Sequence, residues 1–138
     1  MKKVLIISYN FPPKSGVSSR RWAKLAKGLN RNGVECHIIT RDGRFEKGVN
    51  WSKDISSIDK SKIYKVRNPY PRFFEKPSRF ILIRFLKYII IKFLSQFFFK
   101  IDTAQFFYKN LIPKCREIIN NGVKNIIVSG PPHTLFYQ

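Results

Sequence analysis

The chain has 138 residues, which is enough for one hydrophobic core and too few for two ordinary domains. With 43% hydrophobic and 15% aromatic residues, it is not a disordered tail. Its net charge of +19 favours anionic partners, namely nucleic acid, acidic lipid surfaces or phosphorylated small molecules.

The first part of the chain predicts a strand, a helix and a second strand. Residues 3–8 and 34–40 are short apolar runs typical of buried strands. The helix between them is expected to begin at Ser18 or Ser19, either of which can cap it, and to end before Gly33. Helical spacing predicts that its buried face consists of Trp22, Leu25, Ala26 and Leu29. Such a βαβ unit has parallel strands.

Two further strands are predicted in the remainder of the chain. A polar loop over residues 41–61 precedes a short strand over 62–67, and a fourth buried strand covers 125–129. Residues 103–121 have helical spacing, with a kink or a restart expected at Pro113. The sequence therefore predicts an α/β protein with a Rossmann-like open parallel sheet of about four strands and flanking helices. Residues 1–138 are expected to form a single, incomplete domain without repeats or linkers, as the front part of a longer protein.

The cysteines and the N-terminus indicate a reducing compartment. Cys36 and Cys115 lie far apart inside apolar patterns and lack metal-ligand spacing, so they are expected to be buried, reduced thiols. The apolar run from Val4 to Ile7 is too short for a signal peptide. We expect a cytoplasmic protein without a metal site.

The first candidate site is the turn after the first strand, "SYNFPPKSGVSSRRW". In open α/β sheets, ligands bind beyond the carboxyl ends of the strands, and a helix N-terminus there attracts anions. Gly16 would let the backbone approach a phosphate or a sugar closely. Arg20 and Arg21 oppose the helix dipole unless an anion or a carboxylate compensates them. The alternative is an ordinary βα turn with solvated arginines.

No cofactor is expected at this turn. It contains neither the glycine pattern of dinucleotide-binding folds nor the lysine-containing phosphate loop of NTP hydrolases.

The second candidate site is "SGPPHT", which follows the fourth predicted strand. Two loops after parallel strands lie at the same edge of a sheet, so this turn and the first one are expected to form one rim. Gly130 permits close approach, and His133 or Thr134 can present a polar group to a ligand. An isolated histidine is more often a cap or a surface residue than a catalyst.

These two motifs, in this order, resemble family-four glycosyltransferases of the GT-B fold. The resemblance covers the chain except its middle. In the first motif and the strand after it, the matching residues are Phe11, Pro12, Pro13, Gly16, Arg21, Gly33 and Thr40. In the later part, they are Asp102, Ser129, Pro131, Pro132, His133 and Thr134. The family's usual second glycine is Val17 here, which narrows the room for a donor diphosphate.

The resemblance implies the acceptor-side, N-terminal part of a glycosyltransferase for cell-surface polysaccharides. Its expected partners are a nucleotide-sugar and a glycan or lipid-linked acceptor. The chain is expected to be a truncated part that lacks the donor-binding second domain, which relatives need for catalysis, and so to be inactive by itself; a separate chain can supply that domain. The residues expected to bind substrate are Asn10, Gly16, Val17, Arg21, Ser129, Gly130, Pro132, His133 and Thr134. No residue is a convincing nucleophile or general base.

Two other functions stay open for the sequence. In the first, the chain is a non-catalytic fragment or a partner subunit. In the second it is a basic nucleic-acid-binding module, with interleaved Phe and Arg as a stacking groove. The aromatic residues instead have helical core spacing and no nucleic-acid motif is present, so we expect no nucleic-acid partner.

The middle segment, residues 73–100, predicts an amphipathic basic and aromatic helix. Three cations within it oppose a membrane-spanning helix. Two interpretations remain: a core helix with a thin solvated stripe, or a helix lying on an anionic membrane surface. The second places the protein at the inner face of the cell membrane as a peripheral protein. The cations expected to contact lipid are Arg79, Arg84, Lys87 and Lys92.

Overall fold

The computed structural model describes residues 2–13, 16–42, 52–56, 58–69, 79–97 and 107–130. Within these residues the strands are β1 (Lys2–Ile7), β2 (Val34–Arg41), β3 (Ile63–Val66) and β4 (Asn125–Val128). The helices are α1 (Val17–Arg31), α3 (Ile81–Phe97) and α4 (Tyr108–Asn120), and two short 3-10 turns, η1 (Ser52–Ile55) and η2 (Lys60–Lys62), precede β3.

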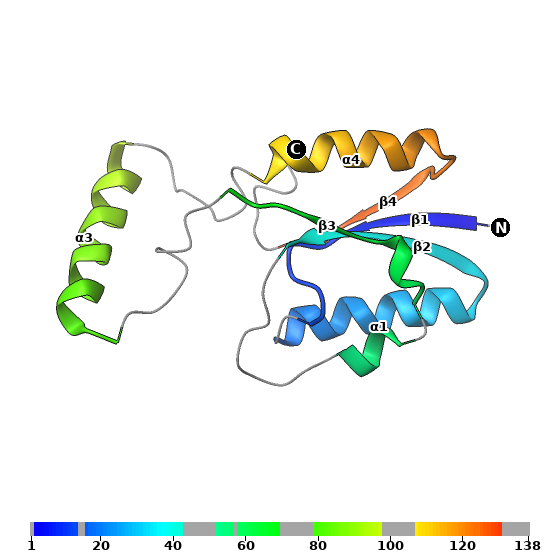
Figure 1. The fold of residues 1–138 in the computed structure, drawn as a ribbon, viewed down its shortest axis with the longest axis horizontal. Coiled ribbons are helices and arrows are strands. Elements are labelled where there is room, and N and C mark those ends of the chain that lie inside the picture. Colours follow the sequence, from blue (N-terminus) through cyan, green and yellow to red (C-terminus); the bar gives the residue numbers. More distant parts are fainter. Residues whose placement is uncertain are drawn as a thin grey trace.

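The strands form one parallel sheet in the order β3-β2-β1-β4. The central strand β1 pairs with β2 on one side, where Ile6 lies opposite Ile38, and with β4 on the other, where Ile7 lies opposite Val128. Helix α1 covers one face of the sheet and α4 covers the other (Figure 1). This arrangement confirms the predicted α/β fold with an open, Rossmann-like parallel sheet.

Alternating side chains of the central strands build two hydrophobic layers. Odd and even positions of a strand point to opposite faces, so β1 supplies both layers. The layer under α1 contains Val4, Ile6, Cys36, Ile38, Ala23 and Ala26. The layer under α4 contains Leu5, Ile7, Ile39, Leu111, Ile118 and Phe107. The continuous apolar run of the first strand thus reflects burial on both faces, as predicted.

Helix α1 differs from its prediction in both its start and its buried face. It begins at Val17, and Gly16 (φ 131°) takes the N-cap position without any side-chain cap, so neither Ser18 nor Ser19 caps it. Leu25 is 41% exposed, whereas Ala23 is buried. The other predicted residues do face the sheet: Ala26 is buried, and Trp22 and Leu29 are partly buried against the same layer. The C-terminus follows the prediction, with Gly33 in the left-handed conformation (φ 74°).

Helix α4 continues through Pro113, so the predicted restart there is wrong. Proline lacks an N–H and disturbs the helix mainly by removing one hydrogen bond. Here it is the sixth of the thirteen residues of α4 and is exposed, while Leu111 and Ile118 hold the helix on the sheet. Gly122 (φ 89°) follows the helix end, as expected.

Both cysteines are free thiols, as predicted. Cys36 is buried under α1, and burial raises its pKa. Cys115 on α4 is half-buried, and burial raises its pKa to about 11.

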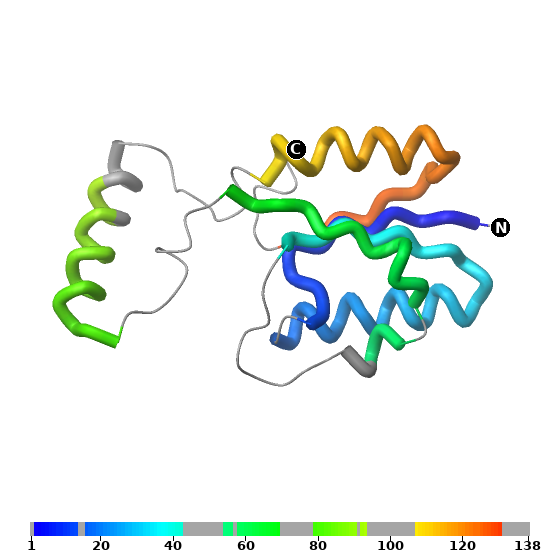
Figure 2. The backbone as a smooth tube through the Cα atoms, in the orientation of Figure 1, coloured from blue at the N-terminus to red at the C-terminus, as the bar shows by residue number. Residues whose placement is uncertain are grey.

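Helix α3 stands apart from the sheet, beyond the carboxyl ends of the strands (Figures 1 and 2). Most of its large apolar side chains are exposed, which contradicts the interpretation as a core helix. Of the helices that the structure describes, none has the length and apolar character needed to cross a membrane.

Candidate functional site at the carboxyl ends of the strands

The turns after β1 and β4 begin side by side at one edge of the sheet. The Ser129 amide donates a hydrogen bond to the Ile7 carbonyl oxygen over 2.9 Å, and the Ser8 amide donates to the Ile39 carbonyl oxygen over 2.9 Å. Ser129 and Gly130 therefore lie beside the first residues of the opening turn. Chain order reverses between β1 and β4, and ligands of open α/β sheets bind at such a point.

The opening turn is held by buried polar contacts. Ser8 is 1% exposed, and its hydroxyl donates a hydrogen bond to the Asn10 carbonyl oxygen over 2.8 Å. Phe11 then enters the layer under α1. The peptide bond between Pro12 and Pro13 is cis. The turn is thus anchored from both sides of the sheet before the chain reaches Gly16.

Gly16 is required for its backbone conformation rather than for space. Its φ of 131° lies in a region that side-chain-bearing residues rarely adopt, yet a Cβ atom at this position would meet nothing within 4 Å. The first intrahelical bond of α1 runs from the Arg20 amide to the Gly16 carbonyl oxygen. The amides of Val17, Ser18 and Ser19 consequently have no acceptor within the helix.

Three buried polar atoms around this edge have no hydrogen-bond partner among the described residues. They belong to three separate elements: Asn10 Oδ1 in the opening turn, Ser19 Oγ in the first turn of α1 and Thr40 Oγ1 near the end of β2. Native proteins pair nearly all buried polar atoms, because an unpaired one costs about 1–3 kcal/mol. Their coincidence at one edge indicates a place built for a polar ligand or bound water.

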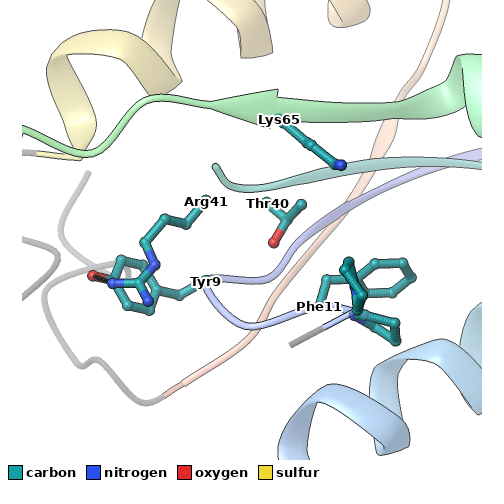
Figure 3. A pocket seen from close by; sticks show the side chains of 7 residues that line it. Tyr9, Phe11, Thr40, Arg41 and Lys65 are labelled. Atoms are coloured by element: carbon teal, nitrogen blue, oxygen red, sulfur yellow. Dashed lines mark hydrogen bonds between the residues drawn. The ribbon is translucent and has the colours of Figure 1, made fainter. Parts of the chain in front are cut away.

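A small pocket opens between the ends of β1, β2 and β3. Its cavity volume is only about 10 Å³, roughly one water molecule, and it opens to solvent; it is lined by Tyr9, Phe11, Pro12, Pro13, Thr40, Arg41 and Lys65. Figure 3 shows Thr40 between the Tyr9 and Arg41 side chains on one side and Phe11 on the other. Two of the lining residues are cations and none is acidic. The pocket suits a small anionic or hydroxyl-rich group.

A network centred on Tyr9 fixes one of these cations. The Tyr9 hydroxyl accepts hydrogen bonds from Arg41 Nη1 over 3.0 Å and from Asn68 Nδ2 over 2.7 Å. The Arg41 guanidinium also lies 4.7 Å from the centre of the Tyr9 ring, and Phe107 contacts that ring edge-to-face at 5.7 Å. The ends of β1, β2 and β3 are thereby tied together. A positioned guanidinium needs little reorganisation to receive an anion.

The arginines at the start of α1 have different surroundings. Arg20 Nε lies 3.1 Å from Asp54 Oδ2 of η1, so a carboxylate compensates this cation against the helix dipole. Arg21 is exposed, and among the described residues it makes no ion pair. Among the described residues, therefore, Arg20 has a carboxylate partner and Arg21 has none.

The structure gathers some of the predicted site residues and leaves others outside its description. Asn10, Gly16, Val17 and Arg21 lie on the opening turn and the start of α1, and Ser129 and Gly130 begin the adjacent turn. The remaining predicted residues of that turn, Pro132, His133 and Thr134, lie outside the described residues, as do Pro131 and Asp102.

Sequence reasoning missed several residues that line the same edge. Tyr9, Arg41, Lys65 and Asn68 were not predicted as site residues, and Thr40 appeared only as part of a strand motif. Tyr9, Thr40, Arg41 and Asn68 lie at or just after the carboxyl end of a predicted strand, which is the signal that could have identified them, whereas Lys65 lies inside the predicted strand and near the end of the observed β3.

Comparisons of the chain with protein-family models, with curated proteins and with solved structures returned no match.

Proposed function

We propose that this chain is the acceptor-side part of a glycosyltransferase of cell-surface polysaccharide synthesis. It would hold a glycan or lipid-linked acceptor against a nucleotide-sugar donor at the cytoplasmic face of the membrane. The single observation that carries the proposal is the edge itself, where the turns after β1 and β4 adjoin around unpaired polar atoms and a basic pocket. The two sequence motifs that resemble family-four glycosyltransferases are these same two turns.

Anion recognition is assigned to the basic side of the pocket. Arg41 and Lys65 supply positive charge, and the free amides at the start of α1 supply hydrogen-bond donors. A sugar diphosphate needs both, because its charge is spread over several oxygen atoms. Charge-assisted bonds of this kind are about twice as strong as neutral ones.

Hydroxyl recognition is assigned to the unpaired polar atoms. Asn10 Oδ1 can accept a hydrogen bond, and the Thr40 and Ser19 hydroxyls can donate or accept one. Sugars present hydroxyl groups that satisfy such atoms. A site of unpaired buried groups also rejects ligands that lack the matching hydroxyl.

The transfer step itself is assigned to a partnership with a donor-binding domain. Departure of the nucleoside diphosphate from the sugar creates negative charge, and stabilising that charge supplies much of the rate in such reactions. In our proposal, this chain orients the acceptor hydroxyl and contacts the donor phosphates, while the second domain holds the nucleoside.

The test is ligand binding by the whole chain, measured by isothermal titration with UDP-glucose, GDP-mannose and an octyl glycoside. We expect saturable binding of at least one ligand and a loss of at least about tenfold in affinity for Arg41→Gln, because a charged hydrogen bond is removed. Arg116→Gln removes the same charge from the exposed surface of α4 and should bind as the unchanged chain does. Circular dichroism confirms that each variant is folded.

Two results would overturn the proposal. One is no binding to any sugar nucleotide or glycoside; the other is equal binding by Arg41→Gln and Arg116→Gln. Retention of a single-stranded oligonucleotide with a steep dependence on salt would instead favour the nucleic-acid-binding alternative.

A further inference from the structure

We infer that α3 docks this protein on an anionic lipid bilayer by laying a defined apolar stripe into the headgroup boundary. This inference goes beyond the proposed sugar transfer and does not depend on it, because it concerns a helix separated from the sheet. Helix α3 lies beyond the carboxyl ends of the strands, on the same side of the molecule as the candidate site (Figure 1).

The stripe consists of residues at positions i, i+3, i+4, i+7 and i+11 of α3. Their exposed fractions are unusually large for apolar side chains: Leu82 79%, Phe85 64%, Leu86 56%, Ile89 45% and Phe93 61%. At about 100° per residue these five share one side of the helix. Contiguous exposed apolar surface of this kind marks a binding face in a soluble chain.

The charges around α3 indicate which kind of surface the apolar stripe binds. No Asp or Glu occurs between Glu75 and Asp102, whereas Arg79, Arg84 and Lys92 are all exposed. Lys92 flanks the stripe, and Arg79 precedes the helix. A helix with an apolar side, flanking cations and no acid matches the surface of an anionic bilayer, where acyl chains lie beneath phosphate groups.

Aromatic and basic side chains are combined on the helix in a way that suits this boundary. Tyr88 is 59% exposed, and the Lys92 ammonium lies 5.9 Å from the centre of its ring. Tyrosine places an apolar ring and a polar hydroxyl at the headgroup level. Arg84, Lys87 and Lys92 within α3 oppose a position through the bilayer, so the proposal places the helix on its surface.

One predicted lipid contact is not part of this surface. Lys87 is only 9% exposed, so it does not present its ammonium to a bilayer as the other three cations do. The proposed surface therefore consists of the five stripe residues with Arg79, Arg84 and Lys92. Docking through it would bring the carboxyl edge of the sheet toward the membrane.

The test is co-flotation of the full chain with vesicles of phosphatidylcholine, with and without about 30% phosphatidylglycerol. We expect binding to the anionic vesicles only, and a strong loss between about 0.1 M and about 0.5 M salt. The double variant Arg79→Gln/Lys92→Gln should bind about 30-fold less tightly, since each cation near the surface contributes about one factor of five. Lys24→Gln/Lys124→Gln removes the same charge elsewhere and should change binding much less.

The apolar stripe is tested separately. Phe85→Ser/Phe93→Ser should lose at least about tenfold in vesicle binding, whereas Leu25→Ser/Ile119→Ser, two residues each 41% exposed on other helices, should not. A Phe93→Trp variant should add fluorescence that bromine on the lipid acyl chains quenches.

Several outcomes would overturn the inference. They are equal binding to neutral and anionic vesicles, unchanged binding of the stripe variant, and no quenching of Trp at position 93. Self-association in ultracentrifugation that Phe85→Ser/Phe93→Ser abolishes, without vesicle binding, would assign the stripe to a second copy of the chain. None of these measurements requires a sugar ligand, so failure here leaves the proposed transfer activity to its own test.

Discussion

Replacing Thr40 by valine is expected to stabilise the protein while weakening its ligand site. Thr40 is 3% exposed and its hydroxyl has no hydrogen-bond partner among the described residues. Burying an unpaired hydroxyl costs about 1–3 kcal/mol. Valine keeps the β-branched shape that suits strand β2 and removes the unpaired atom. The adjoining pocket has room for roughly one water molecule, so we take the lower end of the range.

The expected gain in the free energy of unfolding is therefore about 1 kcal/mol, or about 3 °C in Tm for a chain of this size. Urea denaturation followed by circular dichroism measures it. Ser8→Ala is the matched control, because Ser8 is equally buried at the same edge but its hydroxyl is bonded to the Asn10 carbonyl oxygen. Ser8→Ala should lose about 1 kcal/mol.

We therefore expect the free energy of unfolding to rise in Thr40→Val and to fall in Ser8→Ala. A loss of stability in Thr40→Val comparable to that in Ser8→Ala would show that the Thr40 hydroxyl is already bonded in the free protein. The unpaired atoms would then be no sign of a ligand. Binding measured on the same sample should fall in Thr40→Val, which separates a functional hydroxyl from a merely unfavourable one.

Three further predictions concern the rest of the sheet. Tyr9→Phe leaves two half-buried donors without this acceptor and should lower the free energy of unfolding by about 1 kcal/mol in urea titrations; an unchanged midpoint would contradict the network. The Glu35 pKa lies below its ordinary value of 4.5, chiefly because Lys62 donates a hydrogen bond to the carboxylate. A lowered pKa in the folded state contributes stability above about pH 4.5 that is lost as pH falls further, so Glu35→Gln should flatten the loss of stability between pH 7 and pH 3. Because burial raises the pKa of Cys115 to about 11, iodoacetamide at pH 8 should modify it about 100-fold more slowly in the folded chain than in urea; equal rates would contradict its burial.

The strands and the order of elements were predictable because their signals are local. A continuous apolar run such as residues 4–7 has few alternatives to a strand buried on both faces. Gly33 ends α1 because glycine readily adopts the left-handed conformation, whatever surrounds it. The N-cap of α1 was predicted two or three residues late. Ser18 and Ser19 are good caps, but the glycine before them already adopts the required entry conformation.

The buried face of α1 was only partly predictable, because hydrophobicity does not say how close a helix lies to the sheet. Ala23 and Ala26 allow a short distance, which turns Leu25 toward solvent. The pocket residues Arg41 and Lys65, and Asn68, which bonds to Tyr9, were missed for a similar reason. Polar residues at strand ends are common, and their convergence depends on the register of three parallel strands.

Helix α3 is the case in which composition was informative and periodicity was not. The pattern of alternating cations and aromatic residues fitted both a core helix and a surface helix. Exposure of Leu82, Phe85 and Phe93 contradicts the core interpretation. A helix that is apolar over much of its surface is normally buried. Its separation from the sheet could therefore be recognised only in the structure.

The most direct measurement is a chemical-shift titration of the ¹⁵N-labelled chain with UDP-glucose and an octyl glycoside. The central claim is that the turns after β1 and β4 form one binding edge. It predicts saturable shifts with a common Kd for the amides of Ser8, Asn10, Thr40, Ser129 and Gly130, and no shifts at the amino ends of the same strands, such as Lys3, Glu35 and Asn125. Shifts confined to one of the two turns, or found at the amino ends instead, would contradict it.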